Sequence, residues 1–260
     1  MNASLTTPAL LPTTPGPEEG YSQVVKVQLK LREMILAGEL AAGSRIAELS
    51  IVEKLGASRT PIRAALMRLE QEGLLDALPT GGYAVRTFSE RDVSDSIELR
   101  GTVEGLAARL AAERGVPPRL LAEAREGLAQ IDALLRDTPA LDDAAFSRYV
   151  VLNHQFHQQL GALSGSPVMV RELDRVSSMP FASPSAFVVV QANTPRARDM
   201  LIVAQDQHWQ ALDAIQRREG ARAEAILREH SRITRRNLLA AVQASQVQGL
   251  PGVQLIRERA

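Results

Sequence analysis

Apolar residues recur every three or four positions through the first part of the chain, which is the spacing that buries one face of an α-helix. This spacing predicts helices over residues 22–37 and 46–55, and a short third helix for which Ser58 is the N-cap. The buried stripe of the third helix consists of Ile62, Ala65, Leu66 and Leu69. Alternating apolar and polar residues on both sides of Gly81-Gly82 then predict a β-hairpin. The pattern therefore indicates a winged helix-turn-helix over residues 21–88.

The third helix has a polar face that suits DNA. Arg59, Thr60 and Arg63 lie off the buried stripe at the N-terminal turn, where a recognition helix presents side chains to the major groove. We expect Arg59 and Arg63 to reach base edges or phosphates, and Thr60 to contact phosphate. Gly82 is expected to let the wing approach the minor groove. A solvated helix start is the alternative for these residues, and the hairpin that follows favours DNA binding.

The rest of the chain is a succession of helices separated by short breaks. Ser89-Glu90-Arg91-Asp92 is a capping sequence that predicts a helix over residues 89–114. Its inward face is expected to contain Val93, Ile97, Leu99, Val103, Leu106, Ala107 and Leu110. Further helices are expected over residues 119–136, 142–164, 166–179, 195–219 and 222–245. The expected fold is mostly α, with a helical bundle over residues 89–246 and flexible tails over residues 1–20 and 247–260.

Composition narrows the class of protein. Lysine plus arginine and aspartate plus glutamate both number 30, so any affinity for nucleic acid must come from a local patch. The chain has no cysteine, which excludes disulfides and cysteine-based metal sites. No apolar run approaches membrane-spanning length, and the first residues do not form a signal peptide. These features predict a cytoplasmic protein with no membrane partner.

Specific motifs carry a family resemblance. The run Ser58-Arg59-Thr60-Pro61-Ile62-Arg63, followed by Glu72-Gly73-Leu74 and Gly81-Gly82, resembles the DNA-binding domain of the GntR family of bacterial transcription regulators. The helices of residues 89–246 resemble the all-helical FCD effector domain of the FadR branch of that family. The resemblance implies a ligand-responsive repressor, not an enzyme, that binds a palindromic operator as a homodimer.

Histidines provide the candidate chemistry of the second domain. Asn153 and His157 are one helical turn apart, so they project from the same face. His208 and His230 lie at similar distances on either side of Gly220, so two antiparallel helices would bring them opposite each other. Imidazoles that meet inside a bundle suit Zn²⁺ or Ni²⁺. The alternative is that each histidine is satisfied singly at a surface or interface.

The resemblance assigns these positions more closely. Many FCD domains bind a divalent metal through an acidic residue, a histidine four positions later and two histidines 22 apart. Asn153, His157, His208 and His230 occupy those positions here. Asn153 stands where an aspartate is common and contributes no charge, so lower metal affinity or a different metal is expected. A metal-free pocket in which the histidines bind the effector directly is the alternative.

An arginine and two aromatic residues complete the expected site. Arg100 matches an arginine that in this family often receives an effector carboxylate, although a solvated arginine is the alternative. Phe181 and Phe187 are candidates for an apolar wall. Similarity to the vanillate-responsive type within the family implies a small carboxylic acid, with an aromatic one favoured. A metal-dependent enzyme that uses the histidines is the alternative function, but the sequence contains no nucleophile motif to support it.

Overall fold

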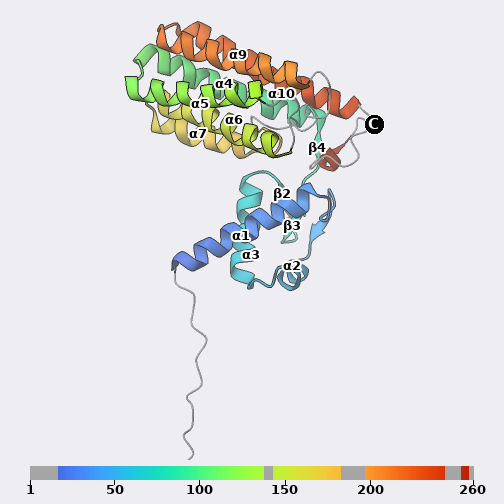
Figure 1. Ribbon diagram of the computed structural model, residues 1–260. Helices are drawn as coiled ribbons and strands as arrows, with labels where there is room; N and C mark the ends of the chain where they lie inside the picture. The colour runs from blue at the N-terminus through green and yellow to red at the C-terminus, as the bar shows by residue number, and fades with distance from the viewer. Residues whose placement is uncertain (1–16, 138–142, 183–196, 244–252, 258–260) are drawn as a thin grey trace, which may run out of the picture.

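The computed structural model describes residues 17–137, 143–182, 197–243 and 253–257. Figure 1 shows two parts: a small N-terminal unit of helices and strands, and a bundle of long helices beside it. The hydrophobic core is divided into two clusters: one lies in the bundle, and the other fills the winged helix and also includes Val93, Ile97 and Leu255. The mostly helical fold, with a winged helix-turn-helix before a helical bundle, is therefore as the sequence predicts.

The N-terminal unit is a winged helix. It contains α1 (Pro17–Leu36), β1 (Arg45–Ile46), α2 (Glu48–Leu55), α3 (Arg59–Gln71), β2 (Leu75–Ala77) and β3 (Tyr83–Val85). The strands form an antiparallel sheet in the order β1-β3-β2, in which β2 and β3 make the expected hairpin. The predicted stripe of α3 is buried in the core of this unit.

The start of the second helix differs from the expected one. Ile46 belongs to β1, where it pairs with Tyr83, and α2 begins two residues later at Glu48. Leu49 is consequently 58% exposed, because the short helix buries only Ile51 fully. Ser58 does occupy the N-cap position of α3, but its hydroxyl makes no capping hydrogen bond.

The second part is a bundle of helices. It contains α4 (Glu90–Arg114), α5 (Pro118–Asp137), α6 (Asp143–Leu163), α7 (Pro167–Ser178), α9 (Ala197–Gln216) and α10 (Gly220–Gln243). Ser89 and Asp92 form the expected capping box at the start of α4. Among the described helices, none combines the length and the hydrophobicity needed to cross a membrane.

The inward face of α4 differs from the expected one. Leu99 and Leu106 are 41% and 37% exposed, whereas Gly101 and Gly105 are buried against α10. Glycine has no Cβ, so the two backbones approach closely along this line. Burial of the small residues, rather than of the leucines, rotates α4 and directs Arg100 and Glu104 into the interior.

The chain ends also differ from the expected tails. Helix α1 begins at Pro17, inside the segment expected to be flexible. Residues 253–255 form a 3₁₀ turn, η1, and Ile256–Arg257 form β5, which pairs with β4 (Phe88–Ser89). Leu255 is completely buried, so apolar burial holds part of the predicted tail of residues 247–260 against the fold.

Candidate metal centre

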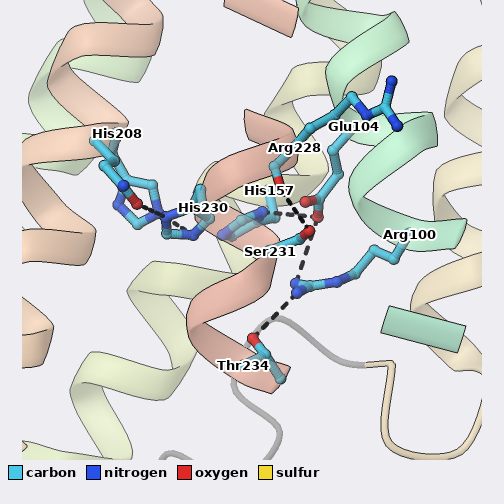
Figure 2. Close-up of polar contacts among 9 residues, drawn as sticks. Arg100, Glu104, His157, His208, Arg228, His230, Ser231 and Thr234 are labelled. Atoms are coloured by element: carbon cyan, nitrogen blue, oxygen red, sulfur yellow. Dashed lines mark hydrogen bonds and ion pairs between the residues drawn. The ribbon is translucent and has the colours of Figure 1, made fainter. Parts of the chain in front are cut away.

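Three histidines from three helices meet in the interior of the bundle. His157 lies on α6, His208 on α9 and His230 on α10, and all three are buried. One ring nitrogen from each histidine lies within 4.8 Å of the others. The Nε2 atoms of His208 and His230 are 3.1 Å apart, as expected for two helices antiparallel about Gly220. Figure 2 shows the three imidazoles in a row that continues to Glu104, with Arg100 beside it.

The Nδ1 atom of each ring faces an oxygen. Nδ1 of His157 is 2.8 Å from Oε1 of Glu104, and Nδ1 of His208 is 3.1 Å from Oε1 of Gln205. Nδ1 of His230 is 3.2 Å from Oε1 of Gln207. The oxygens of Glu104 and Gln205 accept hydrogen bonds, so His157 and His208 donate from Nδ1 and direct Nε2 away from these oxygens.

Gln205 is held in this orientation by a second pair of contacts. Its Nε2 donates to the carbonyl oxygen of Leu128 at 2.9 Å and to Oδ1 of Asp132 at 2.8 Å. Both partners only accept, so the amide oxygen of Gln205 must face His208. Asp132 in turn accepts a hydrogen bond from the indole of Trp209 at 2.9 Å. The tautomer of His208 is therefore fixed by a network that reaches the surface of α5.

Burial keeps His208 and His230 neutral. Desolvation lowers the pKa of His208 and His230 well below the ordinary value of 6.5, and neighbouring charges lower the pKa of both rings further. The Nε2 atoms of His208 and His230 face each other at 3.1 Å. Nε2 of His157 is buried and has no hydrogen-bond partner among the described residues. Three histidines that each offer a ring nitrogen to one small space fit a divalent cation that prefers imidazole.

Glu104 and Arg100 form a buried charged pair beside the histidines. Both are fully buried, and Nη1 of Arg100 is 3.6 Å from Oε1 of Glu104. Nη2 of Arg100 also donates to Oγ1 of Thr234 at 3.2 Å. Burial alone would raise the pKa of Glu104, but Arg100 and the hydrogen bond from His157 hold that pKa below 4.5. The carboxylate of Glu104 is therefore ionised beside the His157 ring.

Glu104 is the functional candidate that the sequence analysis missed. It lies one turn after Arg100 on α4, on the same face. The i,i+4 spacing of Arg100 and Glu104 could have indicated this pair. The expectation that Leu99 and Leu106 face the core placed both charged side chains on the wrong side of α4. Arg100 itself is placed inside the bundle, as the effector hypothesis requires, and not in solvent.

Residues of α6 beside His157 differ in burial. Asn153, a predicted ligand, is buried one turn before His157, and its neighbour His154 is only partly buried. Phe156 belongs to the core, with its ring centroid 4.6 Å from that of His208.

Phe181 is not brought to the histidines. It packs edge-on against Phe88, with ring centroids 5.3 Å apart, beside the winged-helix core. The structure therefore places the Phe181 ring at the winged helix, away from the histidines beside which the effector wall was expected. Phe187 lies outside the described residues.

The predicted DNA-binding residues lie on one exposed part of the winged helix. Arg59 and Thr60 are exposed at the first turn of α3. Arg63 is 74% exposed in its side chain and forms an ion pair with Glu48 at 3.3 Å. Gly82, with φ of 83°, is at the tip of the β2–β3 hairpin, where the guanidinium of Arg45 donates to the carbonyl oxygen of Gly81 at 2.9 Å.

A winged helix with an exposed recognition-helix turn, followed by a separate helical domain, is the architecture of a DNA-binding regulator, and the comparisons with known proteins agree. Residues 23–85 match the bacterial regulatory proteins of the gntR family, and residues 95–232, more than half of the chain, match the FCD domain. The chain therefore belongs to the GntR family of transcriptional regulators, in the group with an FCD domain, and is not an enzyme. The alternative of a metal-dependent enzyme is excluded by this membership.

Curated relatives belong to the same class of protein, transcriptional regulators, and a solved structure has the same fold. An HTH-type transcriptional regulator of Streptomyces ambofaciens is 35% identical to this chain, and the match covers 54% of this chain and 55% of that protein. The HTH-type regulator McbR of Escherichia coli is 25% identical over 62% of this chain and 70% of its own length. A solved structure of McbR covers 85% of this chain and 99% of the solved chain, with a TM-score of 0.61 at 20% identity, which supports the fold. The chain thus spans about half of the length of its Streptomyces relative.

Proposed function

We propose that this regulator is a repressor that binds a palindromic operator as a homodimer and is released by a small carboxylic acid. The observation that carries the proposal is the combination of an exposed recognition-helix turn with a buried centre of three histidines, Arg100 and Glu104. Helix α4 follows directly from the winged helix and holds Arg100 and Glu104, so one helix connects the DNA-binding unit to the histidine centre.

The DNA-binding part of the proposal assigns roles to four residues. Arg59 and Arg63 contact base edges or phosphates, Thr60 contacts phosphate and Gly82 lets the wing approach the minor groove. One recognition helix reads too few base pairs for a specific site, so a two-fold dimer that reads two half-sites about one turn apart is required.

The histidine centre holds one divalent ion, with Zn²⁺ or Ni²⁺ favoured. His157, His208 and His230 supply the Nε2 ligands, and Asn153, from the same face of α6 as His157, supplies a neutral fourth ligand. When bound, the ion supplies a Lewis-acidic centre that attracts an anionic oxygen.

The effector carboxylate binds at Arg100, whose Nε and Nη1 are buried without a hydrogen-bond partner among the described residues. A guanidinium can donate two parallel hydrogen bonds to one carboxylate. The preference for an aromatic acid of the vanillate type rests on the sequence resemblance alone, since Phe181 lies elsewhere.

The test begins with double-stranded DNA selected from a random pool by the purified protein. Symmetric half-sites, and a light-scattering mass of a dimer at micromolar concentration, are expected. A monomer that binds this DNA one-to-one would contradict the dimer. The complex is then titrated with vanillate, protocatechuate, benzoate, gluconate and lactate.

Dissociation by one of these acids, weakened in Arg100→Lys, is expected. A roughly hundredfold loss of DNA affinity corresponds to about 2.7 kcal/mol of coupling. Release by gluconate or lactate alone would overturn the aromatic preference, and an undiminished response in Arg100→Lys would remove Arg100 from the effector site.

A further inference from the structure

The C-terminal residues 253–257 lie against the winged helix, although they follow the last helix of the bundle. Leu255 is 0% exposed and belongs to the same cluster as Leu31 and Phe88. Nε2 of Gln254 donates to the carbonyl oxygen of Leu36 at 2.6 Å. This hydrogen bond satisfies one of the carbonyl groups that the C-terminal turn of α1 leaves without a helical partner.

The same segment pairs with the connection between the two domains. Strand β5 runs parallel to β4, with Phe88 opposite Ile256 and Ser89 opposite Arg257. Strand β4 leads directly into α4, and β5 follows α10 in the chain. The two helices that pack closely beside the histidine centre are therefore both tied to one small sheet, which is seated on the winged helix (Figure 1).

Neither family match includes this sheet. The matches end at residue 85 and resume at residue 95, and the second one stops at residue 232. The winged helix and the bundle are joined by the connection that leads into α4, and Val93 and Ile97 of α4 also pack in the winged-helix cluster. Domains with a small mutual interface normally retain relative motion. A further attachment, made by burial of Leu255 and by β pairing, restricts that motion.

We propose that residues 254–257 form a strap that fixes the orientation of the winged helix relative to the bundle. The strap is anchored at three places: on α1 by Gln254, in the winged-helix core by Leu255, and on β4 by the backbone of residues 256–257. It also preorganises the two recognition helices of a dimer for their half-sites, a role that rests on the proposed DNA binding.

The orientation is measured directly by electron paramagnetic resonance. The sequence contains no cysteine, so Glu53→Cys on α2 and Ala122→Cys on α5, both exposed, carry spin labels on the two domains. Labelled protein is diluted with unlabelled protein so that distances within one chain dominate. We expect one narrow distance distribution for the full chain and a broad one for a chain that ends after Gly252.

A chain that ends after Arg257 keeps β5 and is the matched control, so its distribution should stay narrow. Equal widths in all three chains would overturn the strap. This measurement needs neither operator nor metal, so its outcome is independent of the proposed function.

A point substitution separates the anchor from truncation. Leu255→Ala should lower the melting temperature by roughly 10 °C, because a completely buried leucine is truncated in a small core. Leu29→Ala, at a leucine that is 56% exposed on α1, is the control and should change little. Equal shifts for the two variants would contradict the anchoring role of Leu255.

The DNA-binding role is tested with the selected operator. The chain that ends after Gly252 should lose affinity for two half-sites while it keeps its affinity for one, because the orientation is no longer fixed in advance. Unchanged affinity for two half-sites, with a broadened distance distribution, would refute the DNA role and leave the strap in place.

Discussion

Glu104 is the side chain on which the charge balance of the histidine centre depends. Among the residues around His157, it is the one that brings an ionised carboxylate to Nδ1 of the ring. Asn153, where the family often has aspartate, adds no charge. A carboxylate behind a ligating histidine fixes the ring and makes it a stronger ligand. Glu104 therefore supplies through His157 the negative charge that a ligating aspartate would supply directly.

Replacement of Glu104 by glutamine tests this role. Glu104→Gln retains an oxygen for His157 but removes the charge, so affinity for Zn²⁺ should fall by about 10- to 100-fold. Competition with a chromophoric chelator measures the affinity. His154→Ala, beside the site on α6 and only partly buried, is the control and should bind as the wild type. Wild-type affinity in Glu104→Gln would show that the carboxylate does not support the ion.

Substitution of the two arginines in the first turn of α3 tests the proposed contact with DNA. Arg59→Ala should weaken binding to the selected operator by about 1–3 kcal/mol if the side chain reads guanine. Arg63→Ala should weaken it as well, since an exposed pair with Glu48 is easily exchanged for a phosphate. Fluorescence anisotropy measures both. Arg119→Ala, an exposed arginine on α5, is the control; wild-type affinity in both α3 variants would contradict the assignment.

At the scale of elements, the contact between α4 and α10 is set by glycine. A Cβ added to Gly101 would lie 2.1 Å from Oγ and 2.5 Å from Cβ of Ser231. Gly101→Ala should therefore destabilise the bundle by about 1–3 kcal/mol through overpacking. Gly127 on α5 has open space, its nearest atom being 3.9 Å away, so Gly127→Ala should stabilise by about 0.5–1 kcal/mol.

Urea unfolding measures both glycine variants. Ser231→Gly should relieve part of the damage in Gly101→Ala, because it removes both clashing atoms. Equal stability for the two alanine variants, or no relief in the double variant, would show that the helices separate without cost.

The capping box of α4 gives a prediction on pH. Two hydrogen bonds lower the pKa of the Asp92 carboxyl below 3.8. The larger effect comes from the backbone N–H of Ser89, and the smaller one from its hydroxyl. Asp92→Asn should cost roughly 1 kcal/mol at neutral pH. Because the folded-state pKa is lowered, this contribution is complete above 3.8 and is lost as the pH falls through the folded value. Unfolding curves of the two proteins should therefore converge in acid; a constant difference would contradict the role of ionisation.

At the scale of the whole molecule, periodicity was sufficient for the architecture but not for the faces of the helices. The stripe of α3 and the pairing of His208 with His230 follow from spacing alone. The burial of Arg100 and Glu104 does not, because it depends on how closely α10 approaches Gly101 and Gly105. A hydrophobicity pattern ranks leucine above glycine for burial, and here the backbone contact reverses that order.

The position of residues 253–257 could not be predicted from the sequence either. Leu255 lies in a short segment with turn residues and no period, which is typical of a tail. Its partners, Phe88 and the end of α1, are more than 150 residues away in sequence. A contact of this kind arises from tertiary structure, and no local pattern indicates it.

Metal removal should act on the bundle as a whole, because the ion would join three helices. A ligand that binds only the folded state at 100 times its dissociation constant adds about 2.7 kcal/mol of stability. For a bundle of this size that corresponds to roughly 5–10 °C in melting temperature. Elemental analysis of protein purified without chelator should give one ion per chain, and dialysis against chelator should lower the melting temperature by that amount.

Zn²⁺ or Ni²⁺ should restore the melting temperature of the chelated wild type and of His154→Ala, but not that of His208→Ala. His208 is the informative position, since its Nε2 lies 3.1 Å from that of His230 and the network through Gln205 fixes its tautomer. Protein that contains no metal, and whose melting temperature does not respond to either ion, would contradict the metal centre. The three histidines would then face the effector directly, and added carboxylic acid rather than metal should raise the melting temperature.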